Sequence, residues 1–324
     1  MTFVAPSPSN TARSIVTLTI NPALDISTST PRVVSEHKLR CGPSRIDPGG
    51  GGVNVARTIH RLGGEALAIY AAGGLTGATY RQLLEAEGVP SLAVSLAGTT
   101  RESFTVDETD SGEQFRFVLQ GPELSEGEWQ GCLATLAEAI VPGGYVVASG
   151  SLPPGVPTDF YARVARLAHQ HDARSIVDTS GEALEAALAE GVYLVKPSRR
   201  ELSELVDREL TSEQSEVDAA SELVARGSAE LVGLTLGKAG AVLASASGVI
   251  RLPVPEVHVQ SVVGAGDAFL GAFVWRLSQG RDSESAFRSA VAAGSATAAK
   301  PATDLCALAD VEALETVLPE ATRY

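Results

Sequence analysis

The sequence contains few cysteines and no long apolar run. Its three cysteines, Cys41, Cys132 and Cys306, are scattered and show no CxxC spacing. A disulfide framework and a zinc site are therefore disfavoured, and a reducing, cytoplasmic location is expected. No apolar run reaches the roughly 18 residues of a membrane span. Residues 1–13 lack the pattern of a signal peptide, and we expect them to form a mobile tail.

Positive charge is scarce as well. The net charge is −14, and Lys and Arg nowhere form a block. The resulting negative field argues against nucleic acid and membranes as partners. The same field repels any phosphorylated small molecule. An anionic substrate would therefore need a local set of basic side chains, backbone amides and a divalent cation.

What the sequence does contain is an alternation of short apolar runs with helical stretches. With 324 residues, 44% of them hydrophobic, the chain can bury a large core. Runs rich in Val, Ile and Leu predict strands at residues 15–20, 66–71, 145–148, 175–177, 193–195, 231–236 and 241–244. Helices are expected at residues 53–61, 80–87, 129–140, 159–170, 182–189, 199–206, 217–225, 268–277 and 286–300. This order predicts an α/β fold with a mostly parallel sheet and helices on both sides, and we expect one main domain over residues 14–324.

Two segments, at about residues 26–46 and 99–120, break this alternation. They show the period-2 pattern of strands, and residues 110–112 predict a hairpin turn. The apolar positions of the second segment are Phe104, Val106, Phe115, Phe117 and Leu119. A single layer with an apolar face needs a cover, either a substrate site below it or the same layer of a second subunit. We expect a lid that also forms a homodimer; the alternative is an edge hairpin packed on the main domain.

Three glycine clusters lie at residues 49–54, 237–240 and 264–267. The first and third precede predicted helices, where backbone N–H groups and the helix dipole attract anions. Residues 237–240 have neither the upstream Gly nor the following Ser or Thr of a P-loop. The strand after the first cluster ends in Gly73-Gly74 rather than in an acidic residue, which disfavours a dinucleotide-binding dehydrogenase.

Asp267 directly follows the third cluster. A carboxylate beside amides that hold a phosphate is repelled by that phosphate, but it can accept a proton from a hydroxyl that attacks it. This arrangement is typical of phosphoryl transfer to an alcohol. An Asp at a helix start is equally well explained as an N-cap, and the local pattern leaves both readings open.

At this point the motifs resemble a known family. The stretch GGVNVAR at residues 51–57 and the stretch VGAGD at residues 263–267 are similar to the two signatures of the PfkB carbohydrate kinases. The resemblance extends over nearly the whole chain after residue 13. It is strongest to the bacterial 6-phosphofructokinases of this family, through NPALD, KLRC, GEQFRFVL, SGSLPPGV and VDTSGEAL. The resemblance implies a ribokinase-like three-layer sandwich with a small β-sheet lid.

The resemblance also implies roles for individual residues. Asp267 would be the catalytic base, and the amides of Gly264, Ala265 and Gly266 would hold the transferred phosphate. The implied sugar-phosphate site consists of Asp25, Gly50, Gly51, Asn54, Arg101, Ser149, Lys38 and Arg40, the last two from the same chain or from a partner's lid. The implied nucleotide site consists of Lys196, Ser198, Thr235, Gly237 and Gly240, with Glu201 organising Mg²⁺ through water.

Residue-level reasoning agrees with part of this assignment. Asp25, Ser149, Lys196 and Thr235 are expected at carboxyl ends of strands, where open α/β sheets bind ligands. Arg suits phosphate because its fork bonds two oxygens. Lys38, Arg40, Arg101 and Arg116 would supply the positive charge that the chain otherwise lacks, although Arg116 is equally well read as a solvated surface charge.

Three segments depart from the family pattern. Ser198 replaces the usual Asn of Lys-Pro-Asn-x-x-Glu, and residues 261–263 read Ser-Val-Val. Lys300 and Asp304 stand where similar phosphofructokinases carry Asn and Arg, near the purine and a monovalent-cation site. Dependence on a monovalent cation and regulation by a second ATP are therefore left open.

The expected function is transfer of the ATP γ-phosphate to the 1-hydroxyl of fructose 6-phosphate. Within the same class, 1-phosphofructokinase and tagatose-6-phosphate kinase are the alternatives. From another class, the chain could be a sugar- or nucleotide-binding sensor with little turnover. A nucleoside kinase is disfavoured by the aromatic content of 5%.

Overall fold

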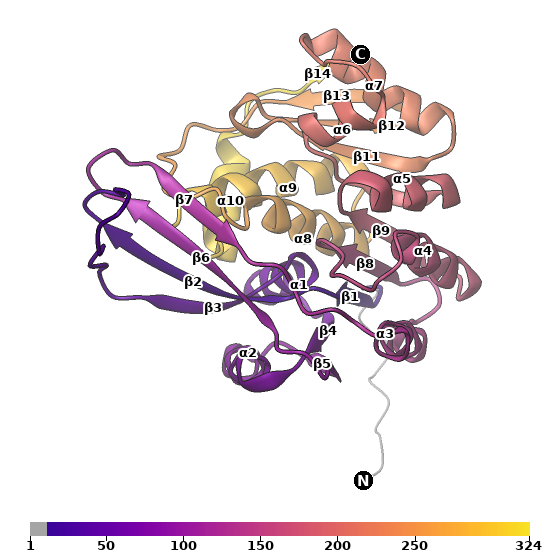
Figure 1. The fold of residues 1–324 in the computed structure, drawn as a ribbon. Coiled ribbons are helices and arrows are strands. Elements are labelled where there is room, and N and C mark those ends of the chain that lie inside the picture. Colours follow the sequence, from indigo (N-terminus) through magenta and orange to yellow (C-terminus); the bar gives the residue numbers. More distant parts are fainter. Residues whose placement is uncertain (1–11) are drawn as a thin grey trace.

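A large twisted sheet forms the centre of the computed structural model, which describes residues 12–324 (Figure 1). Most of the expected tail, residues 1–11, lies outside the described residues. Arg13 is already attached to the body, because its backbone N–H donates to the carbonyl of Ser278 at 2.9 Å. No helix of the described chain is long and apolar enough to cross a bilayer.

The sheet has ten strands in the order β14-β13-β12-β11-β10-β9-β8-β1-β4-β5. The strands from β11 to β5 pair in parallel, whereas β12, β13 and β14 pair antiparallel at one edge. The strands are β1 (Ile15–Thr19), β4 (Leu67–Ala72), β5 (Ser91–Ser95), β8 (Tyr145–Ser149), β9 (Arg174–Asp178), β10 (Val192–Val195), β11 (Ala229–Thr235), β12 (Ala241–Ser245), β13 (Gly248–Leu252) and β14 (Thr322–Arg323). The expected α/β class with a mostly parallel sheet is confirmed.

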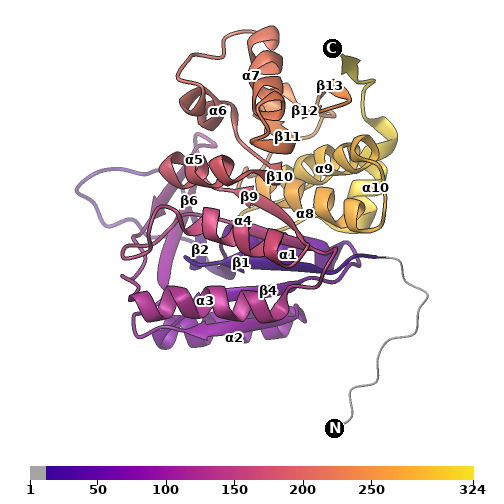
Figure 2. The same ribbon diagram turned by 90° about the vertical axis from the view of Figure 1, so that its right-hand side faces the viewer.

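Helices cover both faces of this sheet (Figure 2). One layer packs in a core that contains side chains of α1 (Gly51–Arg61), α2 (Gly74–Glu87), α8 (Ala265–Ser278), α9 (Ser283–Ala298) and α10 (Leu308–Val317). The other layer packs in a second core with α3 (Glu126–Ala139), α4 (Phe160–Gln170), α5 (Gly181–Glu190), α6 (Arg199–Leu205) and α7 (Glu213–Ala225). Two cores separated by one sheet make the molecule a three-layer sandwich.

The sequence pattern did not predict β5, β13, β14 or α10. The edge strand β5 is only partly buried and mixes polar with apolar residues, so it lacks the apolar run of the central strands. The antiparallel strand β13 and the helix α10 lie after residue 247, where the expected alternation of strand and helix ends. Helix α2 also begins earlier than expected, at Gly74 instead of residue 80.

A second, four-stranded sheet projects from the body in the order β3-β2-β6-β7 (Figure 1). Its strands are β2 (Ala23–Thr30), β3 (Arg45–Gly49), β6 (Arg101–Glu108) and β7 (Gln114–Val118). Strands β6 and β7 form the expected hairpin, and β6 pairs in parallel with β2. The hairpin therefore belongs to a separate sheet, the lid, and not to an edge of the large sheet.

Candidate active site

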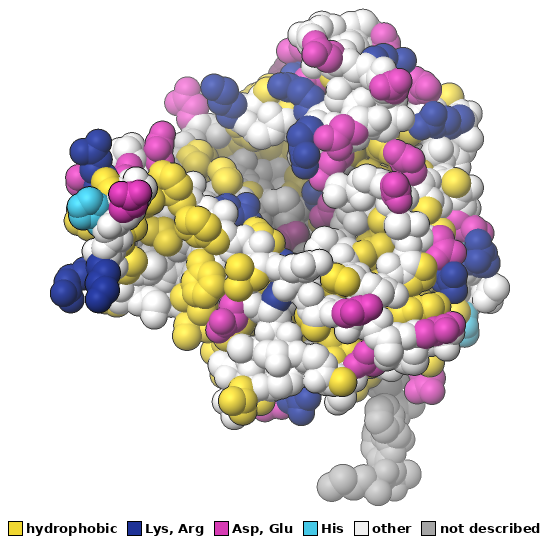
Figure 3. Space-filling model, in the orientation of Figure 1, with side chains coloured by type: hydrophobic (Ala, Val, Ile, Leu, Met, Phe, Trp, Pro, Cys, Tyr) yellow, Lys and Arg dark blue, Asp and Glu magenta, His cyan; other side chains and the backbone are white. Residues whose placement is uncertain are grey.

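Polar side chains gather where the parallel strands end, at the edge of the sheet beneath the lid. Ser149 ends β8, Asp178 ends β9, and Lys196 directly follows β10. These side chains lie beside a cavity of about 310 Å³ between the lid and the body, here called the reaction cavity, which Figure 3 shows as a hollow. Its polar lining includes Asp25, Asn54, Arg101, Arg116, Ser149, Asp178, Glu201 and Asp267. The placement agrees with the general rule that open α/β sheets bind ligands at the carboxyl ends of their strands.

Asp25 reaches this cavity from an unexpected element. The sequence analysis placed it at the end of the first strand, and this is wrong, because β1 ends at Thr19 and Asp25 lies in the lid strand β2. Residues 20–22 separate the two strands, and Asn21 and Pro22 interrupt the apolar run that predicts the first strand at residues 15–20. Gly49 on the neighbouring strand faces the carboxyl group closely: a Cβ there would lie 1.9 Å from Asp25 Oδ2.

Asp267 lies in the first turn of α8, at the deep end of the cavity. Gly264 is the N-cap of this helix, so the alternative reading of Asp267 as an N-cap is wrong. Gly264 has φ +76°, a left-handed conformation that a residue with a Cβ adopts only at a cost. The turn leaves the carboxyl group of Asp267 facing Asn54, whose Nδ2 donates to Oδ2 at 2.9 Å.

The environment of Asp267 opposes its ionisation. Burial, together with the negative charge of Asp178, raises the pKa of Asp267 to about 7. The hydrogen bond from Asn54 and the positive charge of Lys196 oppose this rise. A carboxylate with a pKa near the working pH can accept a proton effectively, as a general base requires.

The glycine turn separates the reaction cavity from a second one. Val263, Gly264 and Asp267 line the reaction cavity. Val262, Ala265 and Gly266, their neighbours in the sequence, line a cavity of about 820 Å³, here called the nucleotide cavity. Thr235, Gly237 and Gly240 also line the nucleotide cavity. Two ligands seated on either side of this turn would meet at the N-terminus of α8.

Lys196 and Asp178 form a buried ion pair beside this turn. Lys196 Nζ lies 3.0 Å from Asp178 Oδ1, and a Cβ at position 266 would lie 3.4 Å from the same Nζ. Burial alone would lower the pKa of Lys196, but the charge and hydrogen bond of Asp178 outweigh it and raise that pKa. The ammonium group is thus held charged next to Gly266.

Asp178 is a site residue that the sequence reasoning missed. It accepts a hydrogen bond from Ser149 Oγ at 3.2 Å and binds Lys196, so it joins the ends of three neighbouring strands. The signal that could have identified it is its position: it is the last residue of an apolar strand, as Ser149 is. That pattern alone does not distinguish a functional carboxylate from a loop residue.

Arginines lie on the same face of the lid as Asp25, beside the reaction cavity. In the lid, directly paired positions share a face, so Asp25, Ser103 and Val118 point to the same side of the sheet. Arg101 and Arg116 belong to this polar face and line the cavity. Burial raises the pKa of Asp25 to about 6, against the opposing charges of Arg101, Arg116 and Arg57.

Most of the apolar face of the lid points away from the reaction cavity, and of its residues named here only Phe104 also contributes to the lining of that cavity. Phe104 pairs with Phe117, and Val106 pairs with Phe115, on the side opposite Arg116. Phe117 is 52% exposed. The substrate cavity therefore does not cover this face, and the same face of a second subunit is the other expected cover. Hydrophobic side chains are visible over much of the lid in Figure 3.

Lys38 and Arg40 do not reach either cavity within this chain. They lie in the exposed segment between β2 and β3, and neither lines the reaction cavity. Figure 3 shows basic side chains at the outer end of the lid, well away from the hollow. Any contact of these two residues with a sugar phosphate would thus have to be made in a neighbouring subunit.

Glycines of the first cluster allow a close approach between α1 and the strand ends. A Cβ at Gly51 would lie 2.1 Å from Ser149 Oγ, and a Cβ at Gly52 would lie 2.6 Å from the carbonyl oxygen of Leu18. Gly50, the N-cap of α1, has φ +120°. Gly50 and Gly51 line the reaction cavity with their backbone. A Cβ at Gly50 would clash with Thr19, and one at Gly51 would displace Ser149.

Ser198 and Glu201 form a capping box at the start of α6. Ser198 Oγ accepts the backbone N–H of Glu201 at 3.3 Å, and Glu201 Oε2 accepts the backbone N–H of Ser198 at 2.7 Å. Ser therefore caps this helix in place of the Asn usual in the family. The pairing of Ser198 with Thr235 holds the capping box next to the end of β11.

The carboxylates near Glu201 fit a divalent ion that is held mainly by substrate phosphates and water. Glu201 lines the reaction cavity, and Asp178 lies close enough to Lys196 to be neutralised by it. Within residues 12–324, no group of three His, Cys, Asp or Glu side chains could enclose a metal. Mg²⁺ commonly keeps several waters and binds through substrate phosphates and one or two carboxylates, which suits this arrangement.

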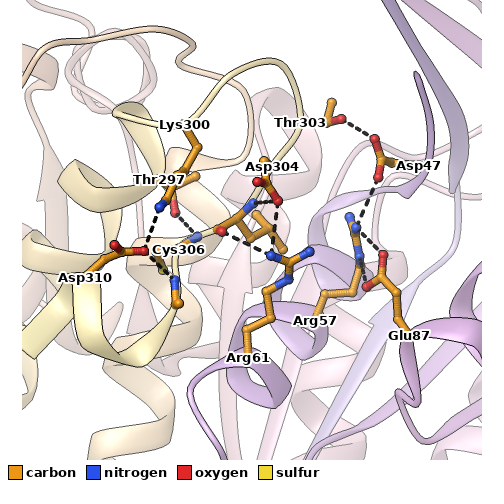
Figure 4. A network of polar contacts seen from close by, with 12 residues as sticks. Asp47, Arg57, Arg61, Glu87, Thr297, Lys300, Thr303, Asp304, Cys306 and Asp310 are labelled. Atoms are coloured by element: carbon orange, nitrogen blue, oxygen red, sulfur yellow. Dashed lines mark hydrogen bonds and ion pairs between the residues drawn. The ribbon is translucent and has the colours of Figure 1, made fainter. Parts of the chain in front are cut away.

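A buried arginine supports Asn54. Arg57, 1% exposed, donates to both carboxylate oxygens of Glu87 at 2.7 and 2.5 Å and to Asn54 Oδ1 at 3.2 Å. Because Arg can only donate, it fixes the oxygen of the Asn54 amide toward itself and the NH₂ group toward Asp267. Figure 4 shows Arg57 between Glu87 and Asp47, the latter in β3 at the base of the lid.

Lys300 and Asp304, which depart from the family pattern, are both bound within the protein. Lys300 Nζ lies 2.9 Å from Asp310 Oδ2, and Asp304 Oδ1 accepts from Arg61 at 3.1 Å (Figure 4). In the same segment, Thr303 Oγ1 donates to Asp47 at 2.5 Å. The segment after α9 is thus tied to α1 and to the lid.

Comparison with known proteins defines the class of this fold and site. The family model for pfkB family carbohydrate kinases matches residues 22–310, and the chain belongs to this family. The expectation drawn from residues 51–57 and 263–267 is thereby confirmed.

Particular relatives are phosphofructokinases. The chain is 46% identical to an ATP-dependent 6-phosphofructokinase isozyme 2 of Mycobacterium tuberculosis (strain CDC 1551 / Oshkosh), over 92% of this chain and 88% of that protein. It is 44% identical to the isozyme of the same name from Escherichia coli K12, over 92% of this chain and 96% of that protein. The crystal structure of Escherichia coli phosphofructokinase-2 in complex with fructose-6-phosphate superposes with a TM-score of 0.89 at 42% identity, covering 94% of this chain and 99% of that one.

Proposed function

We propose that this chain is an ATP-dependent 6-phosphofructokinase, which transfers the γ-phosphate of ATP to the 1-hydroxyl of fructose 6-phosphate. The proposal rests on one observation above all. The turn at residues 263–267 lines two cavities at once, with its carboxylate on one side and its amide-bearing residues Ala265 and Gly266 on the other. A phosphoryl donor and an alcohol placed in these cavities would meet in line at the turn.

The chemical step assigns Asp267 to the acceptor. Its carboxylate takes the proton of the 1-hydroxyl as the sugar oxygen bonds to the γ-phosphorus. The bond between the γ-phosphorus and the bridging oxygen breaks, ADP leaves, and Asp267 later returns the proton to water. The amides of Gly264, Ala265 and Gly266, together with the ammonium of Lys196, stabilise the negative charge on the transferred group.

The sugar phosphate is assigned to the reaction cavity. Asp25 and Asn54 accept and donate hydrogen bonds to sugar hydroxyls, beside the backbone of Gly50 and Gly51 and the hydroxyl of Ser149. Arg101 meets the 6-phosphate, because it lines the cavity on the same face of the lid as Asp25 and its guanidinium can bond two phosphate oxygens. Arg116 on the same face adds a second positive charge.

The nucleotide is assigned to the larger cavity. Thr235, Gly237 and Gly240 line it. Lys196 Nζ lies next to Gly266, and Ser198 pairs with Thr235, so both are close to residues that line this cavity. Mg²⁺, held by the ATP phosphates and water with Glu201 in support, would supply charge neutralisation between the β- and γ-phosphates. The cytoplasm remains our prediction for the location of this reaction.

A homodimer through the lid is part of the proposal. The apolar face with Phe115 and Phe117 points away from the substrate, and a second copy of the same face would cover it. In such a dimer, Lys38 and Arg40 of one lid would approach the reaction cavity of the other subunit. Closure of the lid would exclude water and limit hydrolysis of ATP.

An ADP-release assay across four sugars tests the substrate assignment. Fructose 6-phosphate, fructose 1-phosphate, tagatose 6-phosphate and fructose are compared at equal concentration with ATP and Mg²⁺. We expect the highest kcat/KM with fructose 6-phosphate. A higher value with fructose 1-phosphate or tagatose 6-phosphate would replace the proposed substrate, and no ADP release with any of them would favour a binding protein.

Arg101→Ala tests in the same assay whether Arg101 contacts the 6-phosphate or another part of the sugar. The variant should raise the KM for fructose 6-phosphate by about one to two orders of magnitude, as loss of a charged hydrogen bond does. The kcat/KM for fructose should change little. An equal loss for both sugars would show that Arg101 does not contact the 6-phosphate.

A further inference from the structure

A cavity at the opposite edge of the large sheet has no part in the proposed reaction. It has a volume of about 690 Å³ and is lined by Tyr145, Arg174 and Tyr193, which lie at the amino-terminal ends of β8, β9 and β10. The reaction cavity lies at the carboxyl ends of the same strands. Arg13 and Arg281 complete the basic lining. We call this the distal cavity.

Basic side chains that form no ion pair are concentrated at the distal cavity and at the two cavities of the proposed reaction. Most of the 25 Lys and Arg side chains form ion pairs with carboxylates. Among those that form none in the described residues, Arg101 and Arg116 line the reaction cavity, Lys238 lines the nucleotide cavity, and Arg13, Arg174 and Arg281 line the distal cavity. The others lie in the lid segment at residues 32–40 or stand alone at Arg81 and Arg288.

None of the three distal arginines forms an ion pair with a carboxylate of residues 12–324. The protein carries 39 Asp and Glu residues and a net charge of −14, so basic side chains readily find acidic partners. Residues 1–11 contain no Asp or Glu, and the tail cannot neutralise them. In the reaction cavity, the two arginines that form no ion pair, Arg101 and Arg116, lie where we place the 6-phosphate of the sugar.

Arg174 is held ready to bind. Its guanidinium lies 4.9 Å from the ring centre of Tyr193 and 5.6 Å from that of Tyr145, and it donates to the Tyr145 hydroxyl at 3.0 Å. The planar group offers five N–H donors, and contact with two rings fixes its orientation while leaving the other donors available. Burial raises the pKa of Tyr145 to about 12, and the nearby charge of Arg13 opposes that rise.

Two carboxylates also line the distal cavity, and neither neutralises the arginines. Asp282 is the N-cap of α9, and its oxygens accept the backbone N–H and the hydroxyl of Ser285 at 2.9 and 2.7 Å. Glu230 is exposed on β11 and forms no ion pair within residues 12–324. The positive charge at the floor of the cavity is therefore left for a ligand.

We propose that the distal cavity binds the phosphate group of a small phosphorylated metabolite, held by Arg174, Arg281 and Arg13. Bidentate guanidinium contacts suit the oxygens of a phosphate group, and the volume of the cavity exceeds what inorganic phosphate alone would fill. The site is separate from the reaction cavity, so a ligand there would leave the substrates bound.

Titration calorimetry with inorganic phosphate as the probe tests this site. ADP and fructose 6-phosphate are kept saturating, so that the reaction and nucleotide cavities are filled. Three variants are compared with the unchanged protein. Arg174→Ala and Arg281→Ala remove lining arginines, and Arg288→Ala removes an unpaired arginine on α9 that lies outside all three cavities. Arg281 is exposed and has no side-chain partner in the described chain, so its variant should fold normally.

We expect phosphate to bind the unchanged protein and Arg288→Ala with the same affinity. Arg174→Ala and Arg281→Ala should each weaken binding by about tenfold or more, corresponding to the loss of one charged contact. Equal affinity in Arg281→Ala and Arg288→Ala would overturn the proposal. The proposal would also be overturned if the unchanged protein bound no phosphate at concentrations up to about 10 mM, since a Kd in the millimolar range is already weak.

Discussion

Two carboxyl groups, those of Asp25 and Asp267, line the reaction cavity, and the surroundings of each oppose its ionisation. Burial raises the pKa of Asp25 to about 6 and that of Asp267 to about 7. Burial is the main cause in both cases; the negative charge of Asp178 adds to the rise at Asp267, whereas nearby arginines oppose the rise at Asp25. The residue assigned as base is therefore the one whose pKa lies nearest neutrality.

The pH dependence of kcat/KM should follow Asp267. The base must be ionised, so kcat/KM for fructose 6-phosphate should rise with pH, with a midpoint at about 7 and a fall of about tenfold per unit well below it. Asp25→Asn removes the other raised carboxyl group and serves as control; its profile should keep the inflection, moved to somewhat lower pH because the charge of Asp25 contributes to the raised pKa of Asp267. A profile without inflection between about pH 5.5 and 8 would contradict the assigned base.

Ionisation of Asp267 should also cost stability. A carboxyl group whose pKa is raised on folding stabilises the folded state at pH below its ordinary value of 3.8, and this contribution is lost as pH rises to about 7. Asp267→Asn removes the buried charge and keeps an acceptor for Asn54. Its free energy of unfolding, from urea denaturation, should exceed that of the unchanged protein by a few kcal/mol at about pH 8. The excess should shrink toward about pH 5; a constant difference would show that burial does not oppose this charge.

At the scale of elements, helix α1 connects the base to the lid. Arg57 fixes the Asn54 amide toward Asp267, contacts Asp47 in β3, and bonds Glu87 in α2. The positive charge of the same guanidinium opposes the rise in the pKa of Asp25 that burial causes. One buried side chain thus influences both carboxyl groups of the cavity through different contacts.

Arg57→Lys should impair catalysis beyond its effect on stability. Lys keeps the charge but loses the fork, so Glu87 loses a hydrogen bond and the Asn54 amide becomes free to rotate. We expect a loss of about 1.5–3 kcal/mol in the free energy of unfolding and a fall in kcat of about ten- to a hundredfold. Arg61→Lys, on the same helix but bonded to Asp304, is the matched control and should keep kcat. A destabilised Arg57→Lys protein with unchanged kcat and pH profile would make Arg57 purely structural.

The sequence predicted the elements whose signal is local. Apolar runs marked the buried central strands, and glycine clusters marked the helix starts at Gly51 and Ala265. The base could be proposed from its place after the third cluster, but the choice between base and N-cap needed the observed cap, Gly264.

What the sequence could not give depends on tertiary contacts. Asp178 joins the site only because β8, β9 and β10 are neighbours in the sheet, and no local pattern reports that order. The assignment of Asp25 to the wrong strand has a related cause, since local pattern does not report that the chain leaves the large sheet after β1 and enters the lid sheet as β2. The support of Asn54 by Arg57 is an exception that helical spacing of three residues would have revealed.

At the scale of the whole molecule, the lid presents an apolar face with no cover in the described chain. Its polar face carries Arg101 and Arg116 over the substrate, and its apolar face carries Phe115 and Phe117 on the other side. The two faces thus separate substrate binding from subunit contact, and one sheet can serve both.

Phe117→Asp should disrupt the proposed dimer. A charge on this face opposes burial against a second copy, so sedimentation should report a monomer. The KM for fructose 6-phosphate should rise, because Lys38 and Arg40 of the partner would be lost. Leu75→Asp is the matched control: Leu75 is 87% exposed on α2, and its replacement should keep the dimer. A Phe117→Asp protein that remains dimeric would rule out this face as the interface.

The central claim is that Asp267 removes the proton of the acceptor hydroxyl while the turn before it holds the phosphate. The most direct test is the single-turnover rate of phosphoryl transfer in Asp267→Asn, with ADP affinity measured in parallel. The account predicts a rate lower by about two to four orders of magnitude and an ADP affinity within about twofold of the unchanged protein. A transfer rate within about tenfold of the unchanged protein would contradict it.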